Sequence, residues 1–259
     1  MTPSSFDLSG RVALVTGAGS ETGIGFAAAR LLAELGASVA VAATTDRIHE
    51  RALEVGRVAE RASGHVADLT VEAEVARLVD EVVAMHGRLD ILVNNAGMIS
   101  VGTEAEGGNL LGTDFATWQA GVSRNLDTAF LVSRAVLPRL VDQGWGRIVN
   151  VSSVTGPVMA MRNEVTYAAA KAAMVGMTKS VAVDYARAGV TVNAVAPGWI
   201  ATGSQTEQEA AEGLLVPVGR SATPEEVGSA IAWLCTPGAS YVTGQCLVVD
   251  GGHTINEQH

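Results

Sequence analysis

Short apolar runs rich in β-branched residues alternate with longer stretches of helical periodicity along almost the whole chain. The runs predict strands at residues 12–16, 38–43, 65–67, 89–93, 147–151, 190–194 and 245–249. The stretches between them predict helices at residues 24–35, 47–61, 71–86, 114–143, 165–187 and 224–235. Strands that are apolar on both faces and alternate with helices are typical of βαβ units. The pattern therefore predicts an α/β fold.

We expect a Rossmann-type, doubly wound parallel sheet of about seven strands with helices on both faces. The alternation continues to Val249 and every candidate linker is short, so residues 1–259 are predicted to form a single domain. Two segments, residues 99–113 and 200–218, interrupt the rhythm after predicted strands. Ligands of open α/β sheets bind at the carboxyl ends of the strands, so both segments are candidate lids.

Composition excludes several classes of function. A formal net charge of -10 disfavours general affinity for nucleic acid or for an anionic membrane. No signal peptide and no apolar stretch long enough to span a bilayer is visible, and the two cysteines lack a CxxC spacing. Reduced thiols point to the cytoplasm. The five histidines are scattered, so no metal site is predicted.

A glycine-rich turn joins the first predicted strand to the first predicted helix. Gly17, Gly23, Ile24 and Gly25 lie in this turn. Glycines there let a pyrophosphate approach backbone N–H groups at the positive end of the helix. A purely structural turn is the alternative reading.

Polar groups follow two further strands. Asp68 and Leu69 follow the third predicted strand, and an Asn-Asn-Ala-Gly turn beginning at Asn94 follows the fourth. The carboxyl ends of parallel strands meet at one edge of a sheet, so these residues should lie near the glycine-rich turn.

A tyrosine and a lysine are four positions apart in the predicted helix 165–187. Tyr167 and Lys171 therefore share one face of this helix. A nearby ammonium stabilises a phenolate, which would make the tyrosine a better acid–base catalyst. Ser152 and Ser153 end a strand just upstream, and Asn125 lies in the preceding long helix. Separately, each of these polar residues could be structural.

Together these motifs resemble the short-chain dehydrogenase/reductase family over essentially the whole chain, and its 3-oxoacyl-acyl-carrier-protein reductase branch most of all. The resemblance implies an NAD(P)(H)-dependent oxidoreductase that reduces a ketone to a secondary alcohol, or catalyses the reverse. It implies that Asp68 and Leu69 flank the adenine. It also implies that Asn95, Ala96 and Gly97 line the path of the cofactor.

The resemblance further implies a catalytic tetrad of Asn125, Ser153, Tyr167 and Lys171. Tyr167 would transfer the hydroxyl proton and Ser153 would polarise the carbonyl. Lys171 would hold the nicotinamide ribose and lower the pKa of Tyr167, and Asn125 would anchor a water molecule. The serine and the tyrosine are 167 − 153 = 14 positions apart, one more than is common, so Ser152 is the alternative.

Two more comparisons with the family pattern concern the cofactor. Pro197, Gly198, Ile200 and Thr202 resemble the segment that packs against the nicotinamide. The glycine-rich turn departs from the pattern, because five residues rather than three separate Gly17 from the next glycine of the motif. Which side chain of this longer loop faces the phosphates is left open.

Residues after the second predicted strand bear on the choice of coenzyme. Thr44, Thr45 and Arg47 occupy the place where an NAD-dependent enzyme usually has a carboxylate. Hydroxyls and a cation favour NADP(H) over NAD(H). In the alternative, Thr45 only caps the helix and Arg47 is solvated. The acidic Glu21 and Asp46 weaken the positive field.

The substrate is left open by the sequence. An acidic carrier protein needs a basic docking face, and residues 142–145 provide none. A small ketone, or a sugar-like polyol oxidised with NAD, is the alternative, and Met98, Met159, Met161 and Trp199 could line an apolar substrate pocket.

Two other classes of protein are disfavoured. An extended-type epimerase needs a longer C-terminal domain, and a nucleotide-sensing regulator needs no tetrad. The family habit of pairing its two longest helices predicts a homotetramer through residues 114–143 and 165–187.

Overall fold

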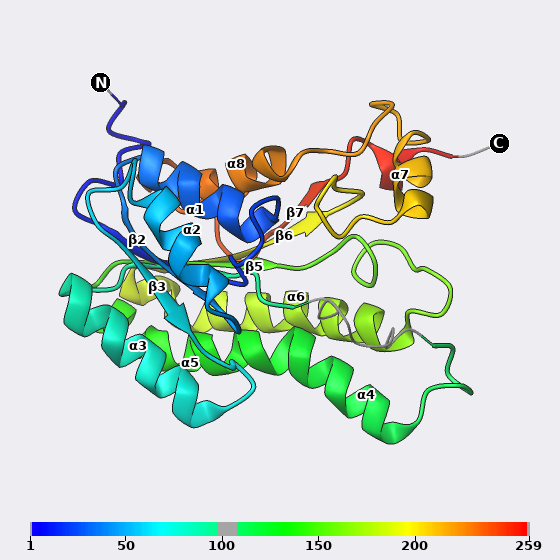
Figure 1. Cartoon of the computed structure of the whole chain (residues 1–259), viewed down its shortest axis with the longest axis horizontal. Helices are drawn as coiled ribbons and strands as arrows, with labels where there is room; N and C mark the ends of the chain where they lie inside the picture. Colours follow the sequence, from blue (N-terminus) through cyan, green and yellow to red (C-terminus); the bar gives the residue numbers. More distant parts are fainter. Residues whose placement is uncertain (1, 98–107, 258–259) are drawn as a thin grey trace.

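A computed structural model describes residues 2–97 and 108–257. Its described residues form one seven-stranded sheet in the order β3-β2-β1-β4-β5-β6-β7 (Figure 1). All six strand pairings are parallel. The strands are β1 (Val12–Thr16), β2 (Ser38–Ala43), β3 (Ala62–Val66), β4 (Ile91–Asn94), β5 (Gly146–Val151), β6 (Val190–Pro197) and β7 (Cys246–Val249). The predicted fold class is confirmed.

Helices cover both faces of the sheet. They are α1 (Ile24–Glu34), α2 (Arg47–Val55), α3 (Glu72–His86), α4 (Phe115–Val122), α5 (Thr128–Asp142), α6 (Val165–Tyr185), α7 (Glu207–Gly213) and α8 (Pro224–Leu234). In Figure 1, α1, α2 and α8 lie above the sheet, and α3, α4, α5 and α6 lie below it. None of the described helices is long and apolar enough to cross a membrane.

The apolar character of the strands follows from these two layers. In β1, Ala13 and Val15 pack into the core beneath α1 and α8, whereas Val12 and Leu14 pack into the core beside α3 and α5. Successive side chains of a strand point to opposite faces, so a strand covered on both faces must be apolar throughout.

The second helix and the third strand differ from the prediction. α2 ends at Val55 rather than at residue 61, and β3 begins at Ala62 rather than at residue 65. Pairing with β2 fixes β3, since Val39 lies opposite Ala62. Gly64 weakens the strand signal in the sequence, yet a Cβ there would lie 2.8 Å from the Ile48 carbonyl oxygen of α2. Tertiary packing therefore overrides local preference.

The predicted helix 114–143 is divided. α4 and α5 are joined by a π-helical turn, Ser123–Asp127, which contains Asn125. Such single π turns inside α-helices occur often at functional sites.

Helix α7 was not predicted and lies within the candidate lid 200–218. Its sequence signal is a capping box, in which Thr206 caps the helix and Glu209 bonds back to the Thr206 N–H group. The other candidate lid lies largely outside the described residues.

Candidate active site

A cavity of about 240 Å³ opens beyond the carboxyl ends of β5 and β6. Residues that directly follow these strands form much of its wall, together with the first turns of α6 and part of the predicted lid 200–218. All four residues of the predicted tetrad line it, namely Asn125, Ser153, Tyr167 and Lys171. The fold thus gathers the four polar groups from three separate parts of the chain.

Tyr167 and Lys171 come from the first two turns of α6. The Lys171 ammonium is buried, donates a hydrogen bond to the Val151 carbonyl oxygen at 3.0 Å and lies 5.5 Å from the centroid of the Tyr167 ring. Burial lowers the pKa of Lys171 to about 8, because an apolar environment disfavours its charged form.

The net pKa direction of Tyr167 is opposite to the expectation from the sequence. Burial raises the pKa above the usual value, and the charges of Glu164 and Glu209 raise it further, while a hydrogen bond with Ser153 lowers it. A raised pKa favours the protonated tyrosine, which is the form of a proton donor.

The two candidate serines have different surroundings. The Ser152 hydroxyl is buried and donates to the Lys171 carbonyl oxygen at 2.9 Å, which ties β5 to α6. Ser153 is less buried, and its hydroxyl accepts a hydrogen bond from the Thr155 N–H at 3.1 Å and bonds with Tyr167. Ser153 is thus the serine whose hydroxyl meets the tyrosine.

Asn125 is buried in the π turn, and its side-chain amide donates to the Gly121 carbonyl oxygen at 3.2 Å. Gly97, at the end of the turn after β4, lies beside it. A Cβ on Gly97 would be 3.0 Å from Asn125 Oδ1 and 3.3 Å from Lys171 Nζ. The absence of a side chain at Gly97 therefore lets the β4 turn approach both tetrad residues closely.

Asn95 braces the glycine-rich turn. Its side-chain amide donates to the carbonyl oxygens of Thr16 and Gly17, at 3.2 and 3.0 Å. A Cβ on Gly25 would lie 2.5 Å from this amide nitrogen, and a Cβ on Gly17 would lie 2.8 Å from the Ala96 backbone. Gly17 also has a φ of 66°, in the left-handed region. Four of the predicted cofactor residues, Gly17, Gly25, Asn95 and Ala96, are thus packed against one another.

The start of α1 has the features of a phosphate site. Gly23 occupies the N-cap position and no side chain caps the helix, so its first N–H groups lack a side-chain acceptor. A helix N-terminus that opens a glycine-rich turn favours a pyrophosphate, so these residues fit the diphosphate of a dinucleotide. Ile24 extends from this turn into the wall of the catalytic cavity, beside Asn95.

Two side chains of the longer loop contact other parts of the chain. The Thr22 hydroxyl accepts a hydrogen bond from the Gly203 N–H at 2.9 Å, which joins the loop to the predicted lid. Glu21 forms an ion pair with Arg51 at 3.5 Å. The longer loop therefore contacts both α2 and the segment that precedes α7.

The residues predicted to select the coenzyme are all exposed at the carboxyl end of β2. Arg47 Nε donates to the Thr45 hydroxyl at 3.4 Å. Asp46, not Thr45, occupies the N-cap position of α2, so the helix-cap alternative for Thr45 finds no support. Thr44 lies next to this pair in the sequence.

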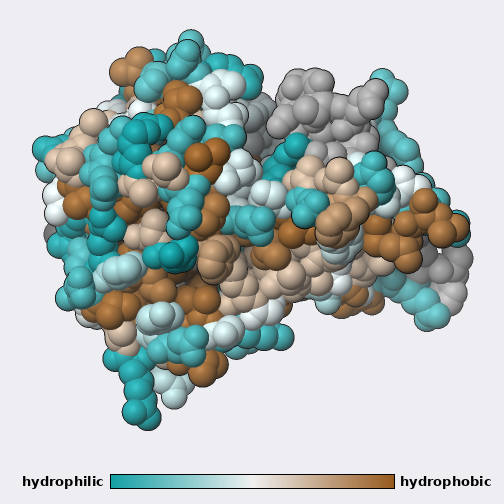
Figure 2. Space-filling view, turned by 90° about the horizontal axis from the view of Figure 1, so that it is seen from below, coloured by the Kyte–Doolittle hydropathy of each residue, from teal (hydrophilic) through white to brown (hydrophobic). Residues whose placement is uncertain are grey.

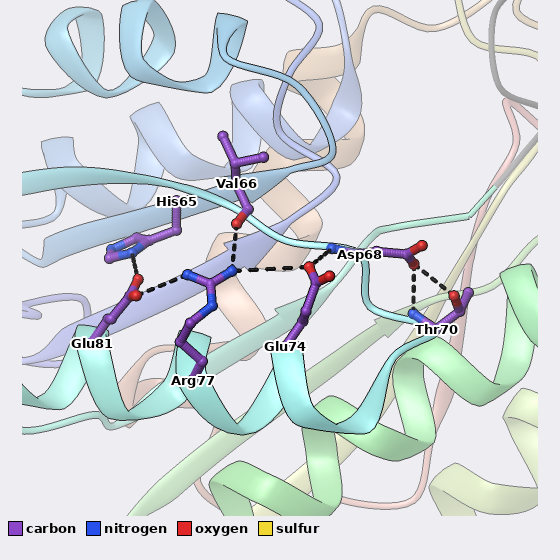
Figure 3. A network of polar contacts seen from close by, with 7 residues as sticks. All are labelled: His65, Val66, Asp68, Thr70, Glu74, Arg77 and Glu81. Atoms are coloured by element: carbon purple, nitrogen blue, oxygen red, sulfur yellow. Dashed lines mark hydrogen bonds and ion pairs between the residues drawn. The ribbon is translucent and has the colours of Figure 1, made fainter.

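Asp68 lies in a polar network at the end of β3 (Figure 3). Its N–H donates to Glu74 at 2.7 Å, and its carboxylate accepts hydrogen bonds from the Thr70 N–H and hydroxyl. Arg77 donates to the Val66 carbonyl oxygen at 3.0 Å and holds β3 against α3. Asp68 is exposed, whereas Leu69 is buried in the core.

Several other residues that the sequence predicted for the site also line the cavity. Its wall includes Pro197, Gly198, Ile200 and Thr202, and the apolar Met159, Met161 and Trp199. Met98 lies outside the described residues. Sequence reasoning missed Glu164, Gln205 and Glu209, which line the same cavity. Only Glu209 had a signal in the sequence, the capping box of α7.

Comparisons with known proteins agree with this arrangement. The family model described as Enoyl-(Acyl carrier protein) reductase matches residues 17–254. The oxidoreductase UcpA of Salmonella typhimurium is 38% identical over 96% of this chain and 97% of its own. The cis-4-hydroxycyclohexanecarboxylate dehydrogenase of Sinomonas cyclohexanicum is 41% identical over 94% and 96%. The 3-oxoacyl-acyl-carrier-protein reductase FabG of Vibrio cholerae is 39% identical over 95% and 98%.

Solved structures give the same result. A structure from Sinorhizobium meliloti 1021, provisionally assigned as a short-chain alcohol dehydrogenase, has a TM-score of 0.89 and 34% sequence identity. It covers 98% of this chain and 100% of its own. The fold and the site define an α/β oxidoreductase. The chain belongs to the short-chain dehydrogenase/reductase family, whose members use NAD(P)(H).

The packing of Gly25 against Asn95 gives a first prediction. Gly25→Ala should destabilise the protein by about 1–3 kcal/mol, because the added methyl group has no room beside the Asn95 amide. It should also weaken cofactor binding at least about tenfold. Urea unfolding and a fluorescence titration with NADPH measure the two effects.

The control for this prediction is Gly112→Ala, in an exposed turn where the new Cβ has ordinary contact distances of 3.4 Å or more. It should leave cofactor binding unchanged. Equal cofactor affinity of Gly25→Ala and the wild type would contradict the role assigned to this packing.

Proposed function

We propose that this protein is an NADP(H)-preferring reductase that converts a ketone to a secondary alcohol and catalyses the reverse reaction with Tyr167 as the acid and base. One observation carries the proposal: Asn125, Ser153, Tyr167 and Lys171 line a single cavity that the glycine-rich turn reaches through Ile24.

The chemistry follows from the surroundings of each group. When bound, the nicotinamide cofactor supplies or accepts the hydride. The Ser153 hydroxyl hydrogen-bonds to the substrate oxygen and polarises the carbonyl. Tyr167, kept protonated by burial and by two nearby carboxylates, donates its proton to the developing alkoxide.

Lys171 and Asn125 support this transfer. The Lys171 ammonium, already hydrogen-bonded to the Val151 carbonyl, holds the ribose hydroxyls. Asn125, buried in the π turn beside Gly97, anchors a water molecule through which Tyr167 exchanges its proton with solvent. Ser152 is bonded to the Lys171 carbonyl and serves to position α6.

The mechanism predicts that Tyr167→Phe keeps the fold but loses about 10²–10⁴-fold in turnover, because it removes the hydroxyl that donates the proton to the alkoxide. The measurement is loss of NADPH absorbance with a panel of cyclic and acyclic ketones. NADPH affinity, measured by fluorescence, should survive the change. Near-normal turnover by a correctly folded Tyr167→Phe variant would refute the tetrad assignment.

The preference for NADP(H) rests on the charges around the end of β2. Arg51 is paired with Glu21, Glu50 and Glu54, whereas Arg47 forms no ion pair with a described residue. The Arg47 guanidinium therefore keeps its charge available for a 2′-phosphate, and Arg51 offsets the charge of Glu21. The hydroxyls of Thr44 and Thr45 add neutral donors.

Replacing Ala43 with Asp tests this preference. Ala43 ends β2, and the glycine-rich turn passes close to it, since a Cβ on Gly19 would lie 3.0 Å from the Ala43 methyl group. A carboxylate there should repel a 2′-phosphate and shift the ratio of kcat/KM toward NADH by about tenfold or more.

Ala43→Asn, which has nearly the same size and no charge, is the matched control and should change the ratio much less. A wild-type enzyme that already uses NADH better than NADPH would show the NADP(H) proposal to be wrong.

Two observations bear on the substrate class. The relatives include an enzyme named for a hydroxylated ring acid and one named for an acyl-carrier-protein substrate, so their names do not agree on one substrate. Residues 142–145 precede β5 and so lie at the amino ends of the strands, whereas the cavity lies at their carboxyl ends. The lack of basic residues in this stretch therefore does not bear on docking of a carrier protein at the cavity. A small ketone or polyol is the second candidate, and the apolar Met159, Met161 and Trp199 in the cavity wall are compatible with it.

A homotetramer is part of the proposal. Apolar side chains stand exposed on the predicted interface helices, with Phe115 on α4, Phe130 on α5 and Val183 on α6 exposed by 71%, 48% and 81%. Figure 2 shows the face of the molecule below the sheet, where apolar residues gather. Exposed apolar patches of this kind mark protein interfaces.

Light scattering should therefore give four times the monomer mass of 26.6 kDa at micromolar concentration. Val183→Glu should shift the mass toward smaller species, because it buries a charge in the interface. Leu53→Glu, an equally drastic change at an exposed position of α2, should not. A monomeric mass for the wild type would refute the tetramer.

A further inference from the structure

Two carboxylates in the cavity wall take no part in the proposed reaction. Glu164 and Glu209 both line the cavity. Tyr167 lines the same cavity, and after the larger effect of burial the charges of both glutamates raise its pKa. The pKa of Glu164 is itself raised, first by burial and then by Glu209.

The two carboxylates differ in their hydrogen bonds. Glu209 accepts hydrogen bonds from the Thr206 N–H and hydroxyl, at 2.7 and 3.1 Å, and so completes the capping box of α7. Glu164 occupies the N-cap position of α6 but makes no side-chain cap hydrogen bond. Its carboxylate forms no hydrogen bond or ion pair with any of the residues that the structure describes.

The backbone directs Glu164 to this position. The preceding residue, Asn163, has a φ of 62°, and is the single non-glycine residue in the left-handed region within the described chain. Asparagine tolerates that conformation better than most residues. A half-buried carboxylate without a partner is energetically unfavourable, and a donor group on a ligand relieves that cost.

The other polar groups around the cavity are mostly neutral. Its wall includes the hydroxyl and amide side chains of Thr155, Thr202, Ser204 and Gln205. Glu207 and Glu212 add negative charge on α7, which carries no basic residue. Arg162 is the cation nearest to Glu164 in the sequence, and it is exposed and does not line the cavity.

An anionic substrate group placed beside Glu164 would be repelled by that carboxylate. A cationic group would be attracted by Glu164 but repelled by the Lys171 ammonium, which lines the same cavity. A hydroxyl group donates a hydrogen bond to the carboxylate without either penalty.

We propose that Glu164 is the specificity-determining residue and that it selects a neutral ketone or alcohol carrying a second hydroxyl group, which donates a hydrogen bond to its carboxylate. The same carboxylate excludes substrates that carry an anion at that position. This inference rests on the proposed function, because it uses the same cavity and the same proton donor.

A set of cyclohexanones with different groups at ring position 4 tests the proposal. The groups are methyl, hydroxymethyl, carboxylate and dimethylaminomethyl, so size changes little while charge and donor capacity change. We measure kcat/KM with NADPH, and the affinity of each ketone for the protein–NADP⁺ complex by calorimetry. Calorimetry ranks the four ketones even where turnover is slow.

For the wild type we expect kcat/KM and affinity to be about tenfold higher for the hydroxymethyl ketone than for the methyl ketone. Both quantities should be at least about tenfold lower for the carboxylate ketone than for the methyl ketone. Glu164→Gln keeps the shape of the side chain and removes its charge, and should reduce both differences to about threefold or less. Glu207→Gln removes a nearby charge that does not line the cavity, and should leave both differences unchanged.

The pH profile of alcohol oxidation gives a second measure that a merely structural role would not move. Glu164 raises the pKa of Tyr167, so Glu164→Gln should lower that pKa and shift the rise in oxidation rate to lower pH. Glu207→Gln should leave the profile in place.

Several results would overturn the inference. One is a kcat/KM of the wild type for the carboxylate ketone that equals or exceeds its kcat/KM for the methyl ketone. Another is a higher kcat/KM for the dimethylaminomethyl ketone than for the other three. A third is that Glu164→Gln keeps the wild-type differences between the ketones. Failure of all four ketones to bind while another ketone is reduced would overturn it too. Failure of the proposed function itself is distinguishable, because it would appear as unchanged turnover in Tyr167→Phe.

Discussion

The contact between the Asn95 amide and the glycine-rich turn is the constraint on which the rest of the site depends. It lies where the chain reverses its direction of winding, since β1 pairs with β2 on one side and with β4 on the other. Asn95 follows β4 and bonds to the carbonyl oxygens of Thr16 and Gly17 after β1. Open α/β sheets bind ligands at such a point, because the loops that follow the two neighbouring strands diverge there.

From this point the polar groups continue along the edge of the sheet. Asn94 donates to Asn150 on β5 and to Ser133 on α5, both at 2.8 Å, and Asn150 donates to Thr178 on α6 at 2.9 Å. These groups are buried, so their hydrogen bonds fix the relative positions of β4, β5, α5 and α6, the elements that carry or adjoin the tetrad residues. The catalytic geometry therefore depends on a polar network inside the core as much as on the apolar packing around it.

The electrostatics of the catalytic end follow from burial. Burial lowers the pKa of Lys171 and so disfavours its charged form. Burial also raises the pKa of Tyr167, and two carboxylates raise it further. The spacing of four residues predicts that the lysine and the tyrosine share one helix face, but the pKa direction depends first on burial and then on carboxylates from α7 and from the residue before α6. That is why the expectation of a lowered tyrosine pKa was wrong while the shared cavity was not.

The sequence by itself determined the parallel sheet, the positions of most strands and the residues that carry the motifs. It could do so because a strand buried on both faces must be apolar throughout, and because glycine is required where backbones approach within a few ångströms, as at Gly17 and Gly25. Only the tertiary structure decided the start of β3, the π turn at Asn125 and the place of Glu164 in the cavity. Each of these depends on contacts between residues far apart in the chain, and local residue preferences carry no record of such contacts.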